Sequence, residues 1–520
     1  MRWRRRDTAR ARLPRGEGPW AWLSAGSVAL SLLLLALLLG LLLSRGLGHF
    51  WPGDVALVTL EDGRQLAGRA VREEPLPDGS GRERLYRTGN RDLDGAIWDW
   101  VALAAIHEVS YPRELLVLER RRWGEFIGRL VALEPEAGPR LEGEAAWSAL
   151  EARLVALEAR REAIRRLREQ TIRPLVRRLE REGESAEVTR ALAAAEARIG
   201  ALRASLGGAS LVLESVSGQH SIEPLEEVVR ARRPNAMSNL DKLAAWGQGV
   251  WRFLSEGQRA ANTAGGVWPA IFGTVLMVML MSLLVTPFGV LAAVYLNEVA
   301  HQGRLTRLVR IGVRNLAGVP SIVYGVFGLG VFVYGIGGHL DSWFFEASLP
   351  SPTFGTGGLL WASLTLALLT LPVVIVATEE GLARIPHRQR EGALALGATR
   401  LEMLTRVVLP MAMPAMLTGV ILAVARAAGE VAPLMLVGVA KLAPQVPVDG
   451  DFPFLHLERK FMHLGYHIFD AAFHGGDVQA ALPLIYATAL LLVLVILMLN
   501  LTAIFLRHHL RSRHGTLSSY

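Results

Sequence analysis

Six apolar stretches of about twenty residues or more constrain most strongly how this 520-residue chain can fold. A helix needs about 20 apolar residues to cross the roughly 30 Å of hydrocarbon in a bilayer, and each stretch approaches or exceeds that length. Apolar residues make up 51% of the chain, and their concentration in these stretches excludes a single soluble domain. The sequence therefore predicts six transmembrane helices, at residues 22–43, 267–295, 316–336, 359–377, 411–439 and 480–506.

Arginine residues beside these stretches predict their orientation, because short loops rich in Lys and Arg stay in the cytoplasm. Four groups of Arg fall on one side: the N-terminal residues 1–21, the loop after the second stretch, the loop before the fifth, and the tail 507–520. The opposite loop, residues 337–358, has no Lys or Arg. We therefore expect both termini in the cytoplasm, and the net charge of +8 needs no nucleic-acid partner. No small-residue cleavage site follows residues 22–43, which we interpret as an uncleaved anchor.

The segment between the first two stretches, residues 44–265, is mostly polar and is expected outside the cytoplasm as an α+β domain. Residues 55–60 and 65–71 flank Asp62-Gly63, a sequence typical of a β-hairpin because glycine accepts a positive φ. Residues 125–133 and 210–216 are further candidate strands, and we expect the strands to form one small sheet.

A helical pattern follows at residues 142–206, rich in Ala, Leu, Glu and Arg. A 4-3-4-3-4 repeat predicts the seam of a coiled coil in the second of two antiparallel helices. Gly183-Glu184-Ser185 is the expected turn, and Pro174 is expected to kink or interrupt the first helix. The hairpin is either an arm that contacts a partner or a hairpin that packs on the strands. The seam residues are Val188, Leu192, Ala195, Ile199, Leu202 and Leu206.

Arg426 and Glu430 lie one helical turn apart in the fifth stretch and therefore share a helix face. An isolated charge near the middle of a membrane costs at least about 2.5–3.5 kcal/mol, so such residues face a protein interior or a wet pathway and pair. Two interpretations remain open. Arg426 is held ready for an anion with Glu430 as its counter-charge, or the pair only fixes helix packing.

Some chemistry is absent from the sequence. There is no G-x4-G-K-[ST] loop, so the chain lacks the phosphate-binding loop of an ATPase. The chain has no Cys, which excludes disulfides and thiolate metal sites. His456, His463 and His467 are irregularly spaced and are expected at the surface, not in a metal site.

Four runs in the C-terminal half carry a family resemblance. The charged loop 391–410, with Glu391-Gly392-Ala393, Gly397 and Leu409-Pro410, resembles the EAA loop of ABC importer permeases, with Gly392 where the family usually has Ala. RAAGEVAPL, which contains Arg426 and Glu430, is similar to a segment of phosphate importer permeases of the PstA type. NLAGVPSIVYGVFGL, from Asn315 through Ser321, and TPFGVLAAVYLNE resemble two further runs of that family.

The resemblance implies a type I ABC importer permease fold over residues 266–506, in a bacterial inner membrane, in a transporter subunit and not an enzyme. It implies a pathway formed with Arg426, Glu430, Asn315 and Ser321, and docking of an ATPase on the EAA-like loop. The implied partners are a second, homologous permease, an ATPase dimer that binds ATP and Mg, and an extracytoplasmic phosphate-binding protein; this chain itself binds no cofactor.

Two other functions remain open from the sequence. A permease for another oxyanion, sulfate or molybdate, would share the EAA-like loop but need not share the other runs. A membrane sensor or scaffold, with the outer hairpin contacting a signalling partner, would need neither Arg426 within the membrane nor an ATPase-docking loop. Importer function is favoured over the sensor for this reason.

Overall fold

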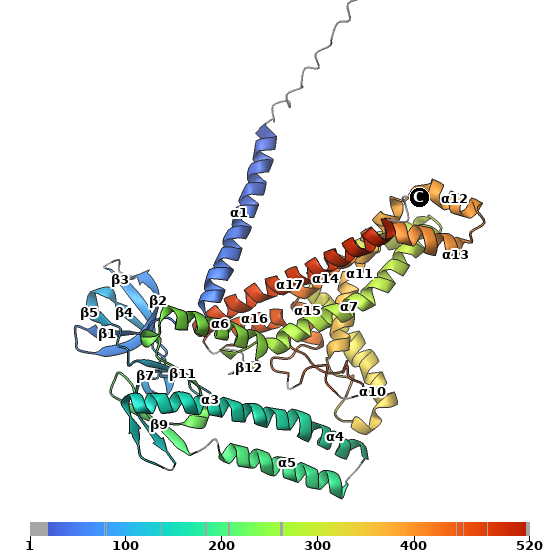
Figure 1. The fold of residues 1–520 in the computed structure, drawn as a ribbon. Helices are drawn as coiled ribbons and strands as arrows, with labels where there is room; N and C mark the ends of the chain where they lie inside the picture. Colours follow the sequence, from blue (N-terminus) through green and yellow to red (C-terminus); the bar gives the residue numbers. More distant parts are fainter. Residues whose placement is uncertain are drawn as a thin grey trace, which may run out of the picture. The chain divides into compact units, whose positions relative to one another are not determined.

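The computed structural model describes residues 19–515, except 77–78, 80, 137, 183–184, 206–207, 260–263, 444, 451 and 476 (Figure 1). The arginines at positions 2–15, Gly183 and Glu184 of the expected turn, and Leu206 of the expected seam lie outside the described residues. The chain divides into two compact units. The first comprises residues 1–49, 253–449 and 455–520, and the second comprises residues 50–252 and 450–454.

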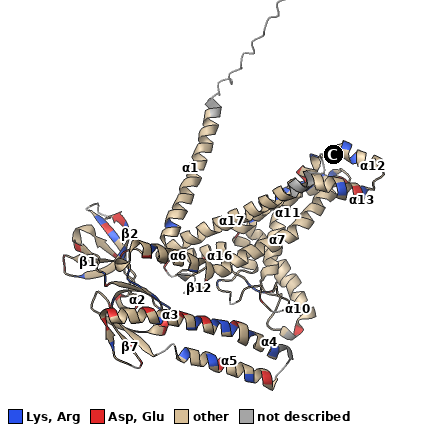
Figure 2. Ribbon diagram, in the orientation of Figure 1, with Lys and Arg blue, Asp and Glu red and all other residues tan. Residues whose placement is uncertain are grey.

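Six helical segments among the described residues are long and apolar enough to cross a membrane, as the sequence predicts. Few charged residues interrupt α1, α7 and α11, whereas α12 and α13 carry both basic and acidic residues (Figure 2). The candidate spans are Trp22–Gly48, Trp268–Val299, Ser321–Phe344, Leu359–Ala383, Arg400–Gly429 and Val478–His509. The helices that form them are α1 (Pro19–Gly48), α7 (Trp268–Val294), α9 (Ser321–Phe327), α10 (Gly338–Phe344), α11 (Leu359–Ala383), α13 (Arg400–Met403), α14 (Leu409–Gly429) and α17 (Val478–Gly515).

Helix α11 is the most buried of these spans, with α7 and α14 packed against it. Its Val374 is fully buried and occupies the space beside two glycines, Gly289 of α7 and Gly419 of α14. A Cβ on Gly289 would lie 2.6 Å from a methyl of Val374, and one on Gly419 would lie 2.7 Å from the Cβ of Ala377. Small residues therefore allow three helices to approach closely, as is common in membrane proteins.

Two predicted spans have different boundaries in the structure. Residue 316 belongs to α8 (Arg304–Leu316), an amphipathic helix, and the third span begins only at Ser321. Pro320 precedes that span, and a proline disfavours the helical conformation of the residue before it. The fifth predicted span, residues 411–439, is broken, because Glu430 is extended and the separate helix α15 (Ala432–Val437) follows with Pro433 in its first turn.

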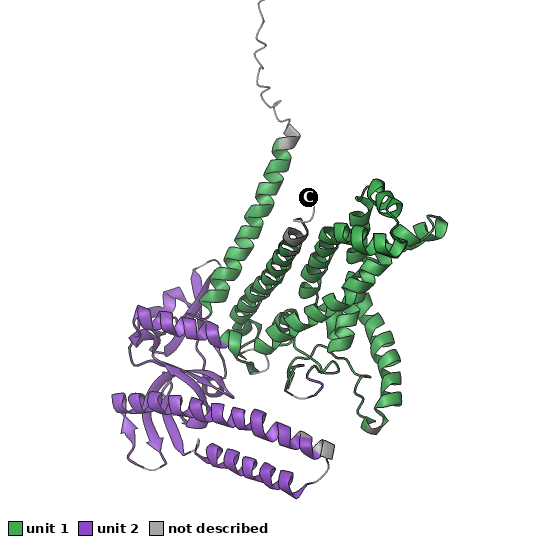
Figure 3. Ribbon diagram, turned by 45° about the vertical axis from the view of Figure 1, so that its right-hand side comes forward, with its two compact units in different colours: residues 1–49, 253–449, 455–520 green, residues 50–252, 450–454 purple. Residues whose placement is uncertain are grey.

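The second unit contains two antiparallel sheets, so the expectation of one small sheet is wrong (Figure 3). The first has the order β4-β3-β2-β1-β5. Its strands are β1 (Ala56–Leu60), β2 (Gln65–Pro75), β3 (Arg82–Arg87), β4 (Trp98–Ala102) and β5 (Ile106–Ser110). The predicted hairpin is confirmed, since β1 pairs with β2 and Gly63 has a φ of 82°.

The second sheet has the order β10-β9-β7-β6-β11, with β8 paired to β7. Its strands are β6 (Leu116–Arg120), β7 (Gly124–Pro135), β8 (Leu141–Glu142), β9 (Ala209–Glu214), β10 (His220–Pro224) and β11 (Val228–Arg232). The predicted strands at residues 125–133 and 210–216 correspond to β7 and β9, which pair directly.

A helical hairpin interrupts this sheet between β8 and β9. It runs through α3 (Gly143–Leu167), a π-helical turn (Arg168–Ile172), α4 (Arg173–Glu182) and α5 (Ala186–Ala204). The π-helical turn ends just before Pro174, which agrees with the predicted interruption. Ala146 and Leu150 of α3 are fully buried against the sheet, so the base of the hairpin belongs to the core of the unit. The coiled coil itself stays a prediction, although Val188, Ala195 and Ile199 are buried in α5.

Candidate translocation and coupling sites

Arg426 and Glu430 face one another at the end of α14. The Arg426 Nε lies 3.5 Å from Glu430 Oε1, and the two side chains remain about one-third and one-fifth exposed, at 33% and 21%. Glu430 caps the helix in an extended conformation. The predicted pair therefore exists, at a break in the span and not inside one continuous helix. Irregular backbone at membrane depth is tolerated where protein or a water-filled cavity surrounds it.

The break beside Glu430 is packed against the start of the third span. Gly325 of α9 lies so close to α15 that an added Cβ would be 2.7 Å from the Cα of Pro433. Tyr324 of α9 is buried, and its hydroxyl donates a 2.7 Å hydrogen bond to the carbonyl oxygen of Leu316. The fold thus brings together two of the four runs that carry the family resemblance, although about a hundred residues separate them in sequence.

The other two predicted pathway residues are placed differently. Ser321 is the first residue of α9 and is half-buried, whereas Asn315 is exposed near the C-terminal end of the amphipathic α8. Within the described residues, neither side chain makes a hydrogen bond with Arg426 or Glu430. The structure brings Ser321 to the beginning of the span that contacts α15, and Asn315 lies before that span.

The EAA-like loop forms two short helices joined by a glycine turn. Glu391, Gly392 and Ala393 lie in α12 (His387–Ala395), and Gly397 adopts a φ of 88°, in the left-handed region that favours glycine. Thr399 and Glu402 then form a reciprocal capping box at the start of α13 (Arg400–Met403). Leu409 and Pro410 begin α14 after the π-helical segment Leu404–Val408.

This loop exposes apolar as well as charged side chains. Leu396 is 91% exposed and Leu401 is 70% exposed, while Glu391 and Gly392 are also exposed. These two leucines are accessible to another protein, and docking of an ATPase on them stays a prediction. The arrangement fits the predicted docking role of the loop.

Two arginines near this loop were not singled out as site residues from the sequence: Arg390 is buried, and the Arg310 side chain is 29% exposed. Arg390 of α12 donates 2.8 Å hydrogen bonds to Glu298 Oε1 and to the carbonyl oxygen of Ile385. Arg310 of α8 donates a 3.0 Å hydrogen bond to Glu379 Oε1 of α11. From the sequence, both arginines serve only as markers of membrane orientation. The acidic partners Glu298 and Glu379, at the ends of apolar spans, are the signal that could have identified them.

The histidines after α15 are buried, so their predicted surface location is wrong. His463 and His467 are 1% and 2% exposed, and burial lowers the pKa of each to about 4. His467 lies in α16 (Leu464–Phe473), and His463 caps that helix by accepting a hydrogen bond from the amide of Gly465. Among the described residues, no group of three His, Cys, Asp or Glu side chains could hold a metal ion.

His456 belongs to a separate polar cluster on the same loop. Its Nε2 lies 2.9 Å from Asp449 Oδ1, and Arg459 donates a 2.7 Å hydrogen bond to Asp449 Oδ2. Burial alone would raise the pKa of Asp449, yet the hydrogen bonds from Arg459 and His456 hold it below its ordinary value. An acidic partner is therefore present beside His456.

Comparisons with known proteins agree with the residue-level resemblance. Residues 285–514 match the family of binding-protein-dependent transport system inner membrane components. Phosphate transport system permease protein PstA 1 of Mycobacterium tuberculosis (strain CDC 1551 / Oshkosh) is 33% identical over 260 residues, covering 50% of this chain and 76% of that protein. A probable phosphate transport system permease protein PstA of Methanocaldococcus jannaschii is 33% identical over 197 residues, covering 37% and 63%.

Among solved structures, an inward-facing conformation of the MetNI methionine ABC transporter covers 53% of this chain and 99% of that chain, with 16% sequence identity and a TM-score of 0.33. The matched family region, residues 285–514, contains the third to sixth candidate spans, the EAA-like loop and the Arg426–Glu430 pair. The chain belongs to the binding-protein-dependent transport system inner membrane components, which have the type I ABC importer permease fold, and within them to the phosphate permeases of the PstA type.

Proposed function

We propose that this chain is the permease subunit of an ATP-driven importer of inorganic phosphate. The observation that carries the proposal is the packing of Gly325 against Pro433, which brings two phosphate-permease runs together beside Arg426 and Glu430. A guanidinium in a low-dielectric pathway attracts an oxyanion and can donate two parallel hydrogen bonds to it. Glu430 balances this charge when the pathway is empty.

The proposed pathway is completed by a second, homologous permease, and Ser321 and Asn315 contribute to its entry or exit. The relatives' family is named for binding-protein-dependent transport, which supports an extracytoplasmic binding protein as the donor of phosphate. Both termini and the EAA-like loop lie in the cytoplasm in this proposal. Their arginines would then lie beside the anionic inner leaflet, which attracts them.

Coupling to ATP hydrolysis follows from the position of the loop between two spans. An ATPase dimer that carries ATP and Mg binds α12 and α13 through Glu391, Gly397 and the exposed leucines. Closure of that dimer moves α12 and α13 together with the ends of α11 and α14, which they join. The contact between Gly325 and Pro433 then changes as α14 and α15 tilt, and the site near Arg426 opens to the other side.

Uptake measurements test the proposal directly. Cells that lack this chain should lose high-affinity uptake of labelled phosphate and regain it when the chain is restored, whereas sulfate and molybdate uptake should be unchanged. Loss of sulfate or molybdate uptake with normal phosphate uptake would instead identify a permease for another oxyanion. Normal uptake of all three anions would remove transport as the function and favour a sensor or scaffold.

A further inference from the structure

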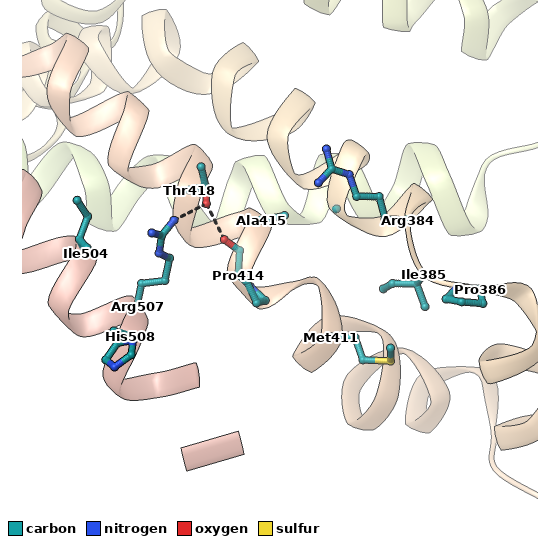
Figure 4. A pocket seen from close by; sticks show the side chains of 11 residues that line it. Arg384, Ile385, Pro386, Met411, Pro414, Ala415, Thr418, Ile504, Arg507 and His508 are labelled. Atoms are coloured by element: carbon teal, nitrogen blue, oxygen red, sulfur yellow. Dashed lines mark hydrogen bonds between the residues drawn. The ribbon is translucent and has the colours of Figure 1, made fainter. Parts of the chain in front are cut away.

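A cavity of about 600 Å³ lies between α11, α14 and α17, away from the Arg426–Glu430 pair (Figure 4). Arg384, from the segment just after α11, lines one side of it. Arg507 and His508 of α17 line the opposite side, and Met411, Pro414 and Thr418 of α14 lie between them. The cavity therefore joins the ends of three spans that the proposed topology places at the cytoplasmic leaflet.

The charged residues that line this cavity are all basic. Its lining holds two arginines and a histidine, and no carboxylate among the described residues lines it. Arg384 is exposed and makes no ion pair with a described residue. Arg507 is held in place because it donates a 3.1 Å hydrogen bond to Thr418 Oγ1, and the Thr418 hydroxyl donates a 2.8 Å hydrogen bond to the carbonyl oxygen of Pro414. Two guanidinium groups without a carboxylate in the lining give the cavity a positive potential, which favours an anion.

The remaining wall is apolar and continues to the outer surface of the unit. Met411 and Ile504 both line the cavity, and each is 41% exposed. An anion with an attached acyl chain can therefore place its charged group between the arginines and its apolar part against these side chains. Basic pockets between transmembrane helices on the cytoplasmic side are suited to phosphate-bearing lipid head groups.

We propose that this cavity is a binding site for a phosphate group, supplied by an anionic phospholipid of the cytoplasmic leaflet. Arg507, positioned by Thr418, binds the phosphate oxygens, and Arg384 on the opposite side adds a second positive charge. The same two arginines would also accept free inorganic phosphate, the other source of the same chemistry. The site rests on the proposed orientation of the membrane spans but not on the identity of the transported substrate.

Lipid retention by the full-length chain tests this site. The chain is purified in neutral detergent, exposed to phosphatidylglycerol or phosphatidylcholine, and analysed by native mass spectrometry. We expect phosphatidylglycerol to bind, and Arg384→Gln with Arg507→Gln to weaken that binding by about tenfold or more, since each hydrogen bond to a charged group contributes substantially. The matched control, Arg307→Gln with Arg314→Gln, removes the same charge from exposed positions of α8 and should retain binding.

A second measurement separates the two phosphate sources and excludes misfolding. Arg384→Lys with Arg507→Lys keeps both charges and should bind more phosphatidylglycerol than the glutamine pair. Millimolar inorganic phosphate is then added to the lipid-bound chain, with sulfate as the control. Free phosphate is the ligand if it displaces phosphatidylglycerol and sulfate does not, or if phosphate binds the chain and phosphatidylglycerol does not. The site is overturned if neither ligand binds, or if the glutamine pair and the α8 control bind phosphatidylglycerol as the unaltered chain does.

Discussion

Glu298 and Arg390 form a buried ion pair that joins the end of the second span to the first helix of the EAA-like loop. Glu298 Oε1 accepts a 2.8 Å hydrogen bond from Arg390, and both side chains are only 11% exposed. Arg390 also donates a 2.9 Å hydrogen bond to the carbonyl oxygen of Leu382 in α11. One guanidinium thus connects the π-helical end of the second span, Tyr295–Val299, with α11 and α12.

Neutralising either residue of this pair should weaken coupling. Removing one member of a buried pair leaves an uncompensated charge and typically costs about 3–5 kcal/mol. We expect Glu298→Gln to lower the melting temperature and to reduce phosphate transported per ATP hydrolysed in proteoliposomes. Glu380→Gln, at an exposed carboxylate of α11, is the matched control. Equal transport-to-hydrolysis ratios in the two variants would limit the ion pair to a structural role.

Arg426→Gln should reduce phosphate uptake at least about tenfold, because glutamine supplies neither the charge nor the forked donor geometry of a guanidinium. Arg426→Lys keeps the charge but not the fork and should retain an intermediate rate. Uptake of labelled phosphate is compared at equal amounts of membrane-inserted protein. If the glutamine variant took up phosphate at the normal rate, the Arg426–Glu430 pair would serve only helix packing, and phosphate would pass through another part of the protein.

Gly397→Trp should prevent ATPase binding. The φ of 88° at Gly397 is strained for any residue with a Cβ, by roughly 1–2 kcal/mol, and the turn sets how α12 and α13 are presented. Glu391→Lys reverses an exposed charge on α12 and should act at the docking surface itself. Co-purification of the ATPase measures both. The control is Gly312→Trp, at a position on α8 with no neighbouring atom in the way, and the ATPase should co-purify with this variant in normal amounts. If the ATPase were also recovered in full with both loop variants, it would not dock on the EAA-like loop.

Only the far end of the helical hairpin should be replaceable without unfolding the second unit. Replacing residues 142–206 removes Ala146 and Leu150, which are fully buried in the core of the second unit. Loss of a buried leucine alone typically costs about 2–5 kcal/mol, so this replacement should unfold the unit. Replacing residues 168–187 removes the far end only and should leave the unit protease-resistant and basal transport at least partly intact. Equal protease resistance of the two replacements would contradict this division.

Acid should destabilise the chain partly through His463 and His467. Their pKa values in the folded state are about 4, against an ordinary value of 6.5, so the unfolded chain binds more protons between these limits. The contribution of the two neutral histidines to the free energy of unfolding is therefore fully present above about pH 6.5, and it is lost as the pH is lowered towards 4. For His467 the nearby carboxylate of Asp470 opposes the effect of burial without cancelling it.

The measurement is the melting temperature of the detergent-purified chain at pH 7 and pH 4.5. His463→Gln with His467→Gln should show a smaller fall than the unaltered chain, whereas His220→Gln, at an exposed position in β10, should not change it. If the melting temperature fell equally in the unaltered chain and in both variants, the acid sensitivity would come from other groups, such as the paired carboxylates.

The number of spans, the first β-hairpin, the helical hairpin and the family could be predicted from the sequence. These features follow from local signals: apolar length sets a membrane helix, Asp62-Gly63 sets a turn, and 3.6-residue periodicity sets a helix. The candidate pair Arg426 and Glu430 was also found locally, since residues four apart share a helix face. The break at Glu430 was missed because an apolar run continues through Pro433, and hydropathy does not register a change in backbone direction.

Contacts between residues far apart in the chain could not be predicted from the sequence and are known from the three-dimensional packing. The division of the strands into two sheets depends on pairing between segments such as β7 and β9, which the helical hairpin separates in sequence. Burial of His463, the Glu298–Arg390 ion pair and the contact of Gly325 with Pro433 depend on how whole helices pack. A charge or a glycine has the same local signal whether it faces lipid, water or another helix, because its environment is set by side chains far away in the chain.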